Sequence, residues 1–526
     1  MKIKKTKIML NPWLYLVIIL LGTSLKFYKL NYSLFWFDEI TTVVHTSGYQ
    51  VFNIPKNEIK SIKFYDDQFH LKKTDQSIIS QLKGLYSRPN LNPFHYSCLM
   101  VWYRIAGDSD LSYRFFNIFI FILTLPILFL LAKTLFKSNL AGWIAVSLYA
   151  VSPYFQFYVQ EARYNTLLVF LIILLHYLFL FALSRKKFKW WILYILVGAI
   201  TLYASVLSGL IIAGHFLYIL FFKKEARIYY TISLIIILLI YLPWIILLIN
   251  NSEKIVNVLA WHSNFGNINF ILLFIFQLFG STRIFSIFSE FPNTYFIYFN
   301  HNFIQQITDI VIMVLIIVSM IYAIKKAPKQ ILFFLFLIFL PFILFFEISD
   351  IIRNTGGSIF LRYQAINFIT VLLFVVYFLS RKIELSNKPW YSGVFMVLVM
   401  IGFISIFFVS NTRCSSPLCN QSINDAEFFS DKRKPLLITD YYTQLGYRHI
   451  GYFMVFLHEC KSDSIDVLRA TPDIENIEEK IDVNNYSDIY VTYASKKLVD
   501  NLKSQFGDRM DSLTVNGITP SWTIKY

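Results

Sequence analysis

Two adjacent acidic residues in an aromatic setting are the clearest chemical signal in this sequence. Asp38 and Glu39 follow Phe35-Trp36-Phe37, just beyond a first apolar segment. Carboxylates are costly to place at a membrane surface, and the neighbouring rings supply no counter-charge, so the pair is a candidate for chemistry. One carboxylate would take a proton from a hydroxyl or amine while the other orients it. The structural alternative is that the two residues cap a helix or pair with Lys and Arg of the same segment.

Three arginines lie where apolar segments meet polar turns: Arg114, Arg163 and Arg362. An arginine in such a position commonly reaches towards lipid headgroups, as an interface anchor. Its forked donors are also well shaped for a phosphate. Glu161 and Arg163 share one tight turn, where a surface salt bridge would contribute only about 0–1 kcal/mol. The supporting candidates come from the same segments and are Arg88, His95, Gln160, Glu161 and Tyr363.

Composition places these residues in a membrane protein. The chain has 526 residues, of which 56% are hydrophobic and 15% charged, whereas soluble domains carry about 25% charged residues. The apolar residues form long runs, such as 229–249 and 331–346. Runs of about 20 residues match the roughly 30 Å hydrocarbon core of a bilayer. The sequence therefore predicts a polytopic α-helical membrane protein.

The net charge of +16 reflects topology rather than nucleic-acid binding. Basic residues form short clusters between apolar runs, at 2–5, 133–137, 185–187, 223–227, 325–329 and 381–388. Cytoplasmic loops of membrane proteins carry this excess of Lys and Arg. The start of the chain resembles a secretory signal, but no small-residue cleavage site follows it, which favours an uncleaved first span with a cytoplasmic N-terminus.

Alternation of basic clusters and apolar runs predicts eleven spans. Their approximate ranges are 12–30, 111–132, 139–157, 163–184, 188–204, 206–222, 228–250, 303–324, 331–348, 361–380 and 391–410. A first outer loop, 31–110, is expected to contain helices that lie on the membrane surface. A second outer loop, 251–302, contains the apolar stretch 268–279, which is short for a span and is predicted to be re-entrant or interfacial.

The last part of the chain, 411–526, differs in charge from the rest, because it has more Asp and Glu than Lys and Arg. Strand-like segments at 435–439, 465–468 and 489–492 alternate with helical segments near 443–457, 473–481 and 495–505. Such alternation is typical of a small α/β domain. We therefore expect two domains, a membrane domain at 1–410 and an extracytoplasmic α/β domain at 411–526.

Cysteines and short motifs suggest no cofactor. Cys414 and Cys419 are close enough in sequence for a disulfide in an oxidising compartment, with two free thiols as the alternative. The cysteine spacing fits no zinc site, and the chain has no glycine-rich phosphate loop. A divalent metal is neither indicated nor excluded.

Four short motifs, taken in order, resemble those of the membrane-embedded glycosyltransferases with the GT-C fold. The nearest group is glycosyltransferase family 39, with the protein-mannosyltransferases and aminoarabinose transferases. The matches are Asp38-Glu39, the segment from Pro93 through Gly107-Asp108-Ser109 to Arg114, Gln160-Glu161-Ala162-Arg163, and Arg362-Tyr363. Two features depart from the family. No proline follows Tyr363 in the late motif, and the charged stretch 56–73 has no counterpart.

The resemblance implies a GT-C enzyme that uses a polyprenyl-phosphate-linked sugar as donor. The acceptor would be a protein, a lipid or a glycan, attacked on the outer side of the cytoplasmic membrane with inversion. Asp38 would act as the base, helped by Glu39, while Arg114, Arg163 and Arg362 would stabilise the departing lipid phosphate. The expected partners are this donor, an acceptor and membrane lipids, without nucleic acid or an organic cofactor.

Three other functions remain open at this point. A transporter or flippase would have a similar number of spans, but such proteins place ionisable groups near the membrane midplane and often have repeated halves. This sequence shows no internal repeat, and its notable charges lie at span ends. A polysaccharide polymerase or ligase would differ in using a lipid-linked oligosaccharide. A non-catalytic scaffold would leave the four motifs without a role.

Overall fold

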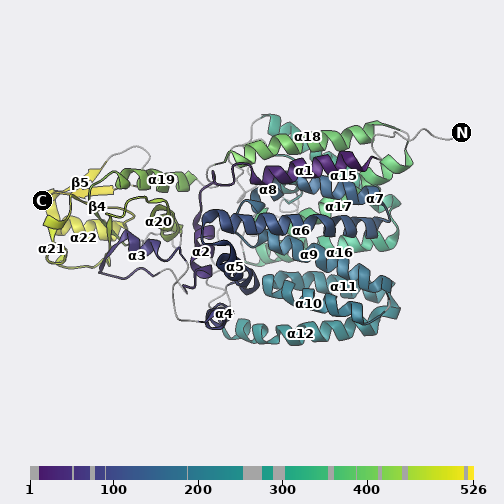
Figure 1. Ribbon diagram of the computed structural model, residues 1–526, viewed down its shortest axis with the longest axis horizontal. Coiled ribbons are helices and arrows are strands. Elements are labelled where there is room, and N and C mark those ends of the chain that lie inside the picture. The colour runs from purple at the N-terminus through teal and green to yellow at the C-terminus, as the bar shows by residue number, and fades with distance from the viewer. Residues whose placement is uncertain are drawn as a thin grey trace. The chain divides into compact units, whose positions relative to one another are not determined.

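The computed structural model describes most of the chain as two compact units (Figure 1). The described residues are 11–49, 53–70, 77–88, 91–185, 187–252, 275, 277–287, 303–353, 361–386, 388–412, 417–440, 448–513, 519 and 521–525. The membrane unit comprises Met1–Ser33, Lys83–Cys98 and Leu111–Thr412. The α/β unit comprises Leu34–Leu82, Leu99–Asp110 and Arg413–Tyr526. The first outer loop therefore contributes residues to both units.

The membrane unit is a bundle of apolar helices. Among the described residues, seven helices have the length and composition to cross a membrane: α6 (Asp110–Phe136), α9 (Asn165–Arg185), α12 (Arg227–Asn250, with the preceding turn), α15 (Phe303–Lys326), α16 (Lys329–Arg353), α17 (Ala365–Leu385) and α18 (Trp390–Ser410). Four shorter apolar helices are α1 (Pro12–Ser24), α7 (Asn139–Ala150), α10 (Lys189–Ala204) and α11 (Gly209–Phe222). The chain is thus a multi-pass membrane protein.

All eleven predicted spans coincide with one of these helices, although only seven are long enough to qualify on their own. One predicted span, 139–157, is wrong as a single helix. It is divided into α7 and α8 (Pro153–Val159), because Pro153 has no N–H to continue α7 and Ser152 caps the new helix through Phe155 N. The predicted segment 268–279 lies mostly outside the described residues.

The centre of the bundle is α17. Its residues from Ala365 to Ser380 are all buried, and it packs against α7, α15 and α16. A helix that is apolar on all sides and surrounded by other helices forms the core of such a bundle. Any polar side chain near the start of α17 is consequently enclosed by protein rather than by lipid.

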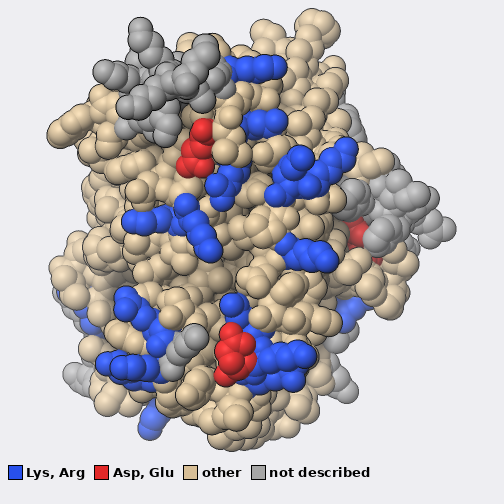
Figure 2. All heavy atoms as spheres, turned by 90° about the vertical axis from the view of Figure 1, so that its right-hand side faces the viewer, with Lys and Arg blue, Asp and Glu red and all other residues tan. Residues whose placement is uncertain are grey.

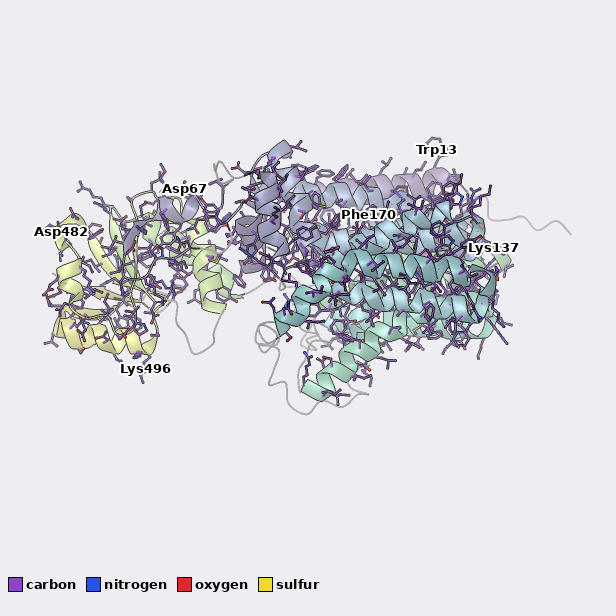
Figure 3. The ribbon with its side chains drawn as sticks, turned by 90° about the horizontal axis from the view of Figure 1, so that it is seen from below. Trp13, Asp67, Lys137, Phe170, Asp482 and Lys496 are labelled. Carbon is purple, nitrogen blue, oxygen red and sulfur yellow. The ribbon has the colours of Figure 1, made fainter. Side chains whose placement is uncertain are left out.

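Basic residues gather over one end of the membrane unit, which we call the basic end (Figure 2). Lys137, after α6, lies at this end in Figure 3. Arg381 on α17 donates to Phe136 O at 2.8 Å, and Tyr377 OH donates to Lys326 O at 3.3 Å, so the ends of α6, α15 and α17 meet there. The predicted basic clusters at 133–137, 325–329 and 381–388 thus lie at one end of the membrane unit, as the predicted topology requires. The other end of the same helices is called the opposite end.

The α/β unit contains a six-stranded sheet with the order β1-β3-β2-β4-β6-β5. Its strands are β1 (Ile59–Ser61), β2 (Pro435–Thr439), β3 (Asp466–Arg469), β4 (Asp488–Val491), β5 (Met510–Leu513) and β6 (Ser521–Ile524). The central strands β3, β2 and β4 are parallel, while β1, β6 and β5 pair antiparallel. All five residues of β2 are buried, as expected for a central parallel strand.

Helices α19 (Pro417–Ser430), α20 (Arg448–Glu459), α21 (Ile477–Lys480) and α22 (Lys496–Phe506) accompany the sheet. The three predicted strands and three predicted helices of this unit are confirmed to within a few residues, except that the start of the first helix lies outside the described residues. Strands β5 and β6 and helix α19 were not predicted. Two residues of this unit that Figure 3 labels, Asp482 and Lys496, lie at its margin.

The first outer loop is more than a set of surface helices. It contains α2 (Phe37–Thr46), α3 (Ile62–Asp66), α4 (Ile78–Tyr86) and α5 (Pro93–Ala106), but also β1, which pairs with β3 of the C-terminal sheet. Residues 59–61 of β1 belong to the charged stretch that had no family counterpart. This pairing is a long-range interaction that no local pattern in the loop could indicate.

Candidate functional site

The opposite end of the membrane unit contains a buried arginine. Arg114 is only 1% exposed and lies in the second turn of α6, about 28 Å from Lys133 along the helix axis. Its Nη1 donates to Leu30 O at 2.6 Å. The interpretation of Arg114 as a lipid-facing anchor is therefore wrong, because the side chain points into the protein. A guanidinium held in this way is positioned before any ligand arrives.

The turn after α8 lies beside the same stretch of α6. Asn117, one helical turn from Arg114, donates from Nδ2 to Glu161 O and to Arg163 O, the latter at 3.2 Å. Glu161 is 7% exposed, which excludes a simple surface position, and Arg163 is half-buried. Asn117 thus connects two of the predicted segments, those that contain Arg114 and Arg163.

Gln160 has a structural role in this arrangement. Its Nε2 donates to Lys26 O at 3.1 Å and to Tyr28 O at 2.9 Å. One turn earlier, Gln156 Nε2 donates to Leu25 O at 3.0 Å. These carbonyls belong to the end of α1 and the turn that follows, so the two glutamines satisfy acceptors that the helix end leaves without partners.

His95 is a neutral member of this end. It lies near the start of α5, its ring faces Tyr164 with the centroids 6.4 Å apart, and burial together with the nearby Arg163 lowers the pKa of His95 to about 3. The imidazole is therefore uncharged at neutral pH and acts as a polar aromatic surface rather than as a cation. Arg88, just after α4, is half-buried, and burial lowers its pKa.

Arg362 and Tyr363 form a short 3₁₀ turn, Leu361–Tyr363, before α17. The Arg362 guanidinium lies 5.0 Å from the centroid of the Tyr363 ring, and this ring stacks on Phe346 of α16. Tyr154 OH of α8 donates to Leu361 O at 3.0 Å. The turn that holds Arg362 is thus attached to α8, which also leads to Gln160 and Glu161.

Lys26 is a buried lysine that the sequence analysis did not single out. It is fully buried, and its Nζ lies 4.9 Å from the centroid of the Phe121 ring, with no hydrogen-bond partner in the part of the chain that the structure describes. The available signal was position, because Lys26 follows the first span at the end opposite to the basic clusters. Lysines of membrane proteins gather in the cytoplasmic loops, so a lysine at the opposite end is an exception that calls for an explanation.

The predicted carboxylates lie in the α/β unit. Asp38 and Glu39 occupy the first turn of α2, where the helix dipole favours anionic side chains. Glu39 is 1% exposed, and its carboxylate accepts a hydrogen bond from Trp36 N at 3.3 Å. Asp38 is half-buried. The capping alternative therefore describes Glu39, whereas Asp38 is the more accessible carboxylate of the two.

Helix α2 packs against α20 of the C-terminal region. At Gly451 an added Cβ would lie 2.5 Å from the Phe37 ring, so only glycine permits this approach. His458, at the end of α20, stacks on Phe35 with ring centroids 5.5 Å apart. Its ring nitrogens lie 3.4 Å from Asp110 and 3.1 Å from Glu459. Burial opposes a charge on His458, but these two carboxylates raise its pKa to about 10.

Chemically, the membrane unit provides several cationic and amide donors, and the α/β unit provides an accessible carboxylate at a helix start. Within the described residues no cluster of His, Cys, Asp or Glu has the geometry of a metal site. Cys414 and Cys419, the predicted disulfide, lie outside the residues whose side chains the structure describes. Cys98 and Cys460 are free thiols.

Comparison with known proteins points to one fold. A family profile described as dolichyl-phosphate-mannose-protein mannosyltransferase matches residues 88–247, a segment that includes Arg114 and Arg163. ArnT from Cupriavidus metallidurans in the apo state is similar, with a TM-score of 0.54 and 11% identity over 97% of this chain and 98% of that chain. ArnT bound to undecaprenyl phosphate gives a TM-score of 0.54 and 10% identity over the same shares.

An oligosaccharyltransferase from Archaeoglobus fulgidus is also similar, with a TM-score of 0.49 and 10% identity over 97% of this chain and 73% of that chain. No curated protein matches the sequence. The predicted resemblance to the GT-C membrane glycosyltransferases of the protein-mannosyltransferase and ArnT group is confirmed, and the helical fold with its small C-terminal sheet is the fold of that group.

Proposed function

We propose that this protein is a membrane glycosyltransferase that moves a sugar from a polyprenyl-phosphate-linked donor to an acceptor on the outer side of the cytoplasmic membrane. The acceptor is a protein, a lipid or a glycan. One observation carries the proposal: the chain shares its fold over 97% of its length with ArnT, one structure of which is bound to undecaprenyl phosphate. The buried Arg114 adds a local argument, because a held guanidinium suits a lipid phosphate.

Asp38 is the proposed general base. It would take the proton from the acceptor hydroxyl or amine as the acceptor atom attacks the anomeric carbon. The bond between that carbon and the phosphate oxygen breaks in the same step, and direct displacement inverts the configuration. Glu39 positions the base rather than replacing it, because its carboxylate holds the start of α2 through Trp36 N.

Arg114, Arg163 and Arg362 are the proposed partners of the leaving phosphate. Negative charge develops on that phosphate as the sugar departs, and fixed donors in a water-poor site stabilise it more than solvent would. Arg114 is preorganised by Leu30 O, and the main chain at Arg163 by Asn117. His95, Gln160, Glu161, Tyr363 and Arg88 support this region through packing and hydrogen bonds.

The proposed topology follows from the basic end. Cytoplasmic loops carry the excess of Lys and Arg, which places the basic end and the N-terminus in the cytoplasm. The domain at 411–526 would then be extracytoplasmic, with the membrane domain at 1–410. The orientation is tested with single cysteines introduced at Lys137 and at Lys496 in a variant whose four native cysteines are replaced by serine. In intact cells, a membrane-impermeant thiol reagent should label only the cysteine at position 496.

The function is tested with the full-length protein in detergent, a panel of radiolabelled polyprenyl-phosphate sugars and a membrane extract as acceptor. Wild type should transfer label from at least one donor, and Asp38→Asn should lose transfer while it still expresses and inserts. Asp67→Asn is the matched control, since Asp67 is an exposed carboxylate of the same loop (Figure 3). Transfer by Asp38→Asn at the wild-type rate would remove Asp38 as the base.

Failure of every single-sugar donor has a separate meaning. Transfer of label from a lipid-linked oligosaccharide alone would identify a ligase or polymerase. Movement of a lipid-linked glycan across vesicles without transfer would identify a flippase. The assay therefore separates the proposed enzyme from both alternatives with one preparation.

A further inference from the structure

The turns before α10 and α12 belong to the basic end as well. Phe222, at the end of α11, packs on Phe333 near the start of α16 with ring centroids 5.0 Å apart, and α12 begins shortly after it in the chain. Phe188, just before α10, contacts Tyr229 of α12 with ring centroids 6.2 Å apart. Since α16 begins at the basic end, these contacts bring the start of α10 to the same face. Figure 2 shows that Lys and Arg are spread over this face.

The turn between α9 and α10 holds two cations near one aromatic ring. The guanidinium carbon of Arg185 lies 5.9 Å from the centroid of the Trp190 ring, and Nζ of Lys189 lies 5.1 Å from the same centroid. Both side chains are exposed, and neither has an ion pair with a described residue. Two like charges held near one ring repel each other, and a bound anion would offset that repulsion.

Other charges of the basic end are compensated by protein groups. Arg381, for example, lies 3.5 Å from Glu384 and donates to Phe136 O at 2.8 Å. The two cations at the start of α10 have aromatic rings as their described neighbours instead, including that of Phe181, which lies 5.1 Å from Arg185. Cation–π contacts hold a charge in place and leave most of its N–H donors available. This turn is therefore suited to an anion that comes from outside the protein.

An apolar stripe continues from Lys189 along α10. Leu193 and Leu196 follow Lys189 by four and seven residues, a spacing that places all three on one face of the helix. Leu193 is 42% exposed and Leu196 is 51% exposed, so the described part of the protein leaves this face uncovered. The face thus presents a cation at its end and apolar side chains along the next two turns.

This pattern favours a ligand that is both anionic and apolar. The forked donors of an arginine suit a phosphate group, and indole rings of membrane proteins gather at the level of the headgroups. A soluble anion would contact the cations and leave Leu193 and Leu196 uncovered, whereas a phospholipid covers both parts with one molecule. An acidic protein segment would have to enter the hydrocarbon layer to reach the leucines, where charged groups are costly.

We propose that an anionic phospholipid binds at the start of α10. Its headgroup phosphate lies on Arg185 and Lys189, beside Trp190. One of its acyl chains lies along Leu193 and Leu196. The site is at the basic end, whereas the proposed transfer site is at the opposite end, so the inference does not depend on the proposed function and stands or falls by a separate measurement.

The test measures lipid binding to the full-length protein in detergent. Affinity-captured protein is equilibrated with mixed micelles that contain radiolabelled phosphatidylglycerol or radiolabelled phosphatidylcholine. Wild type should bind the anionic lipid more tightly, and added salt should reduce the difference. The double variant Arg185→Gln/Lys189→Gln should weaken phosphatidylglycerol binding about 10- to 30-fold, because each basic residue near a membrane surface contributes about a factor of five. Equal affinity of wild type for the two lipids would overturn the proposal.

Lys325→Gln/Lys329→Gln is the matched control. It removes the same charge from two exposed lysines of the basic end, but it leaves the two cations near Trp190 in place. Because exposed charges at a distance are screened, phosphatidylglycerol affinity should fall less than about threefold. Thermal unfolding of each variant checks that it folds. Equal losses in the two double variants would overturn the site, because the preference would then follow the net charge of the whole basic end.

Two further measurements test the apolar half of the site and the kind of anion. Leu193→Ser/Leu196→Ser should weaken phosphatidylglycerol binding about tenfold, because it removes apolar surface that the acyl chain covers. Glycerol phosphate, which carries the phosphate without the chains, should not displace the lipid. Displacement by glycerol phosphate at the affinity of the lipid would identify a site for a free anion and overturn the lipid assignment, as would unchanged lipid binding in the folded leucine variant.

Discussion

The two units hold their candidate residues by different means. In the membrane unit, the side chain of Arg114 and the main chain at Arg163 are fixed by buried hydrogen bonds to Leu30 O and from Asn117. In the α/β unit, Asp38 occupies the start of a short helix that is held by packing, with Phe37 against Gly451 and Phe35 against His458. A buried cation requires specific acceptors, because its desolvation is costly. A carboxylate at a helix start requires only that the helix stay in place.

This difference predicts that loss of a polar side chain lowers the transfer rate most when that side chain lies in the membrane unit. Arg114→Ala should lower the transfer rate about 100- to 1,000-fold, because it removes a fixed donor for the leaving phosphate. The measurement is transfer at saturating donor together with donor binding. Lys325→Ala, which deletes an exposed cation at the basic end, should change the rate less than twofold. Equal losses in both variants would contradict the distinction between the two ends.

In the α/β unit, the transfer rate should fall most when a larger side chain is added at the contact between α2 and α20. Gly451→Val places carbon atoms where the Phe37 ring lies, so α2 must shift and Asp38 with it. Misplacement of a catalytic group by about 1 Å can cost about 100-fold in rate. Gly393→Val is the control, since nothing lies within 4 Å of a Cβ at that helical position. Wild-type transfer by folded Gly451→Val would show that α2 does not depend on α20.

His458 should make the α/β unit sensitive to alkaline pH. Its pKa is raised from 6.5 to about 10 in the folded protein, so the folded state binds a proton that the unfolded state releases above 6.5. The stabilisation of the folded state by protonated His458 is fully present below pH 6.5 and is lost as the pH rises towards 10. The melting temperature of wild type should fall over this interval. His458→Leu should lower the free energy of unfolding by about 2 kcal/mol near neutral pH and should make the melting temperature depend less on pH. Melting temperatures of wild type and variant that fall in parallel with pH would contradict this role of His458.

The smallest expected effect concerns the connection of β1 to the sheet. Asn57 accepts a hydrogen bond from Thr471 N at 2.9 Å at Oδ1 and donates from Nδ2 to Thr471 Oγ1 at 3.3 Å. Asn57→Ala removes both and also strains a residue with φ of 56°, so about 1–2 kcal/mol of stability should be lost. Asn57→Gly removes the hydrogen bonds alone and should lose less. Chemical denaturation of the three proteins gives the comparison.

Much of the fold was predictable because its signals are local. Apolar runs of the right length located the helices of the membrane unit, and the alternation of strand-like and helical segments located β2, β3, β4 and their helices. These features depend on the composition of one segment at a time. The division of 139–157 into α7 and α8 was missed, although Pro153 was the available signal, because apolar character continues across it.

The candidate site was predictable only as a set of residue types. Asp38, Arg114, Arg163 and Arg362 stood out because each belongs to one of four short motifs that resemble those of the GT-C glycosyltransferases. Their burial and partners could not be predicted, since Leu30, Asn117 and Tyr154 carry no chemical signal of their own.

The sequence by itself determined that this is a multi-pass membrane protein with one strongly basic end and a small α/β domain, because hydrophobic length, charge clustering and strand periodicity are properties of continuous segments. Only the tertiary structure decided that β1 of the first outer loop completes the C-terminal sheet, that Gly451 permits α20 to support α2, and that Asn117 connects the segments of Arg114 and Arg163. These features join residues far apart in the chain, and their energies depend on contacts and burial that exist only once the chain has folded.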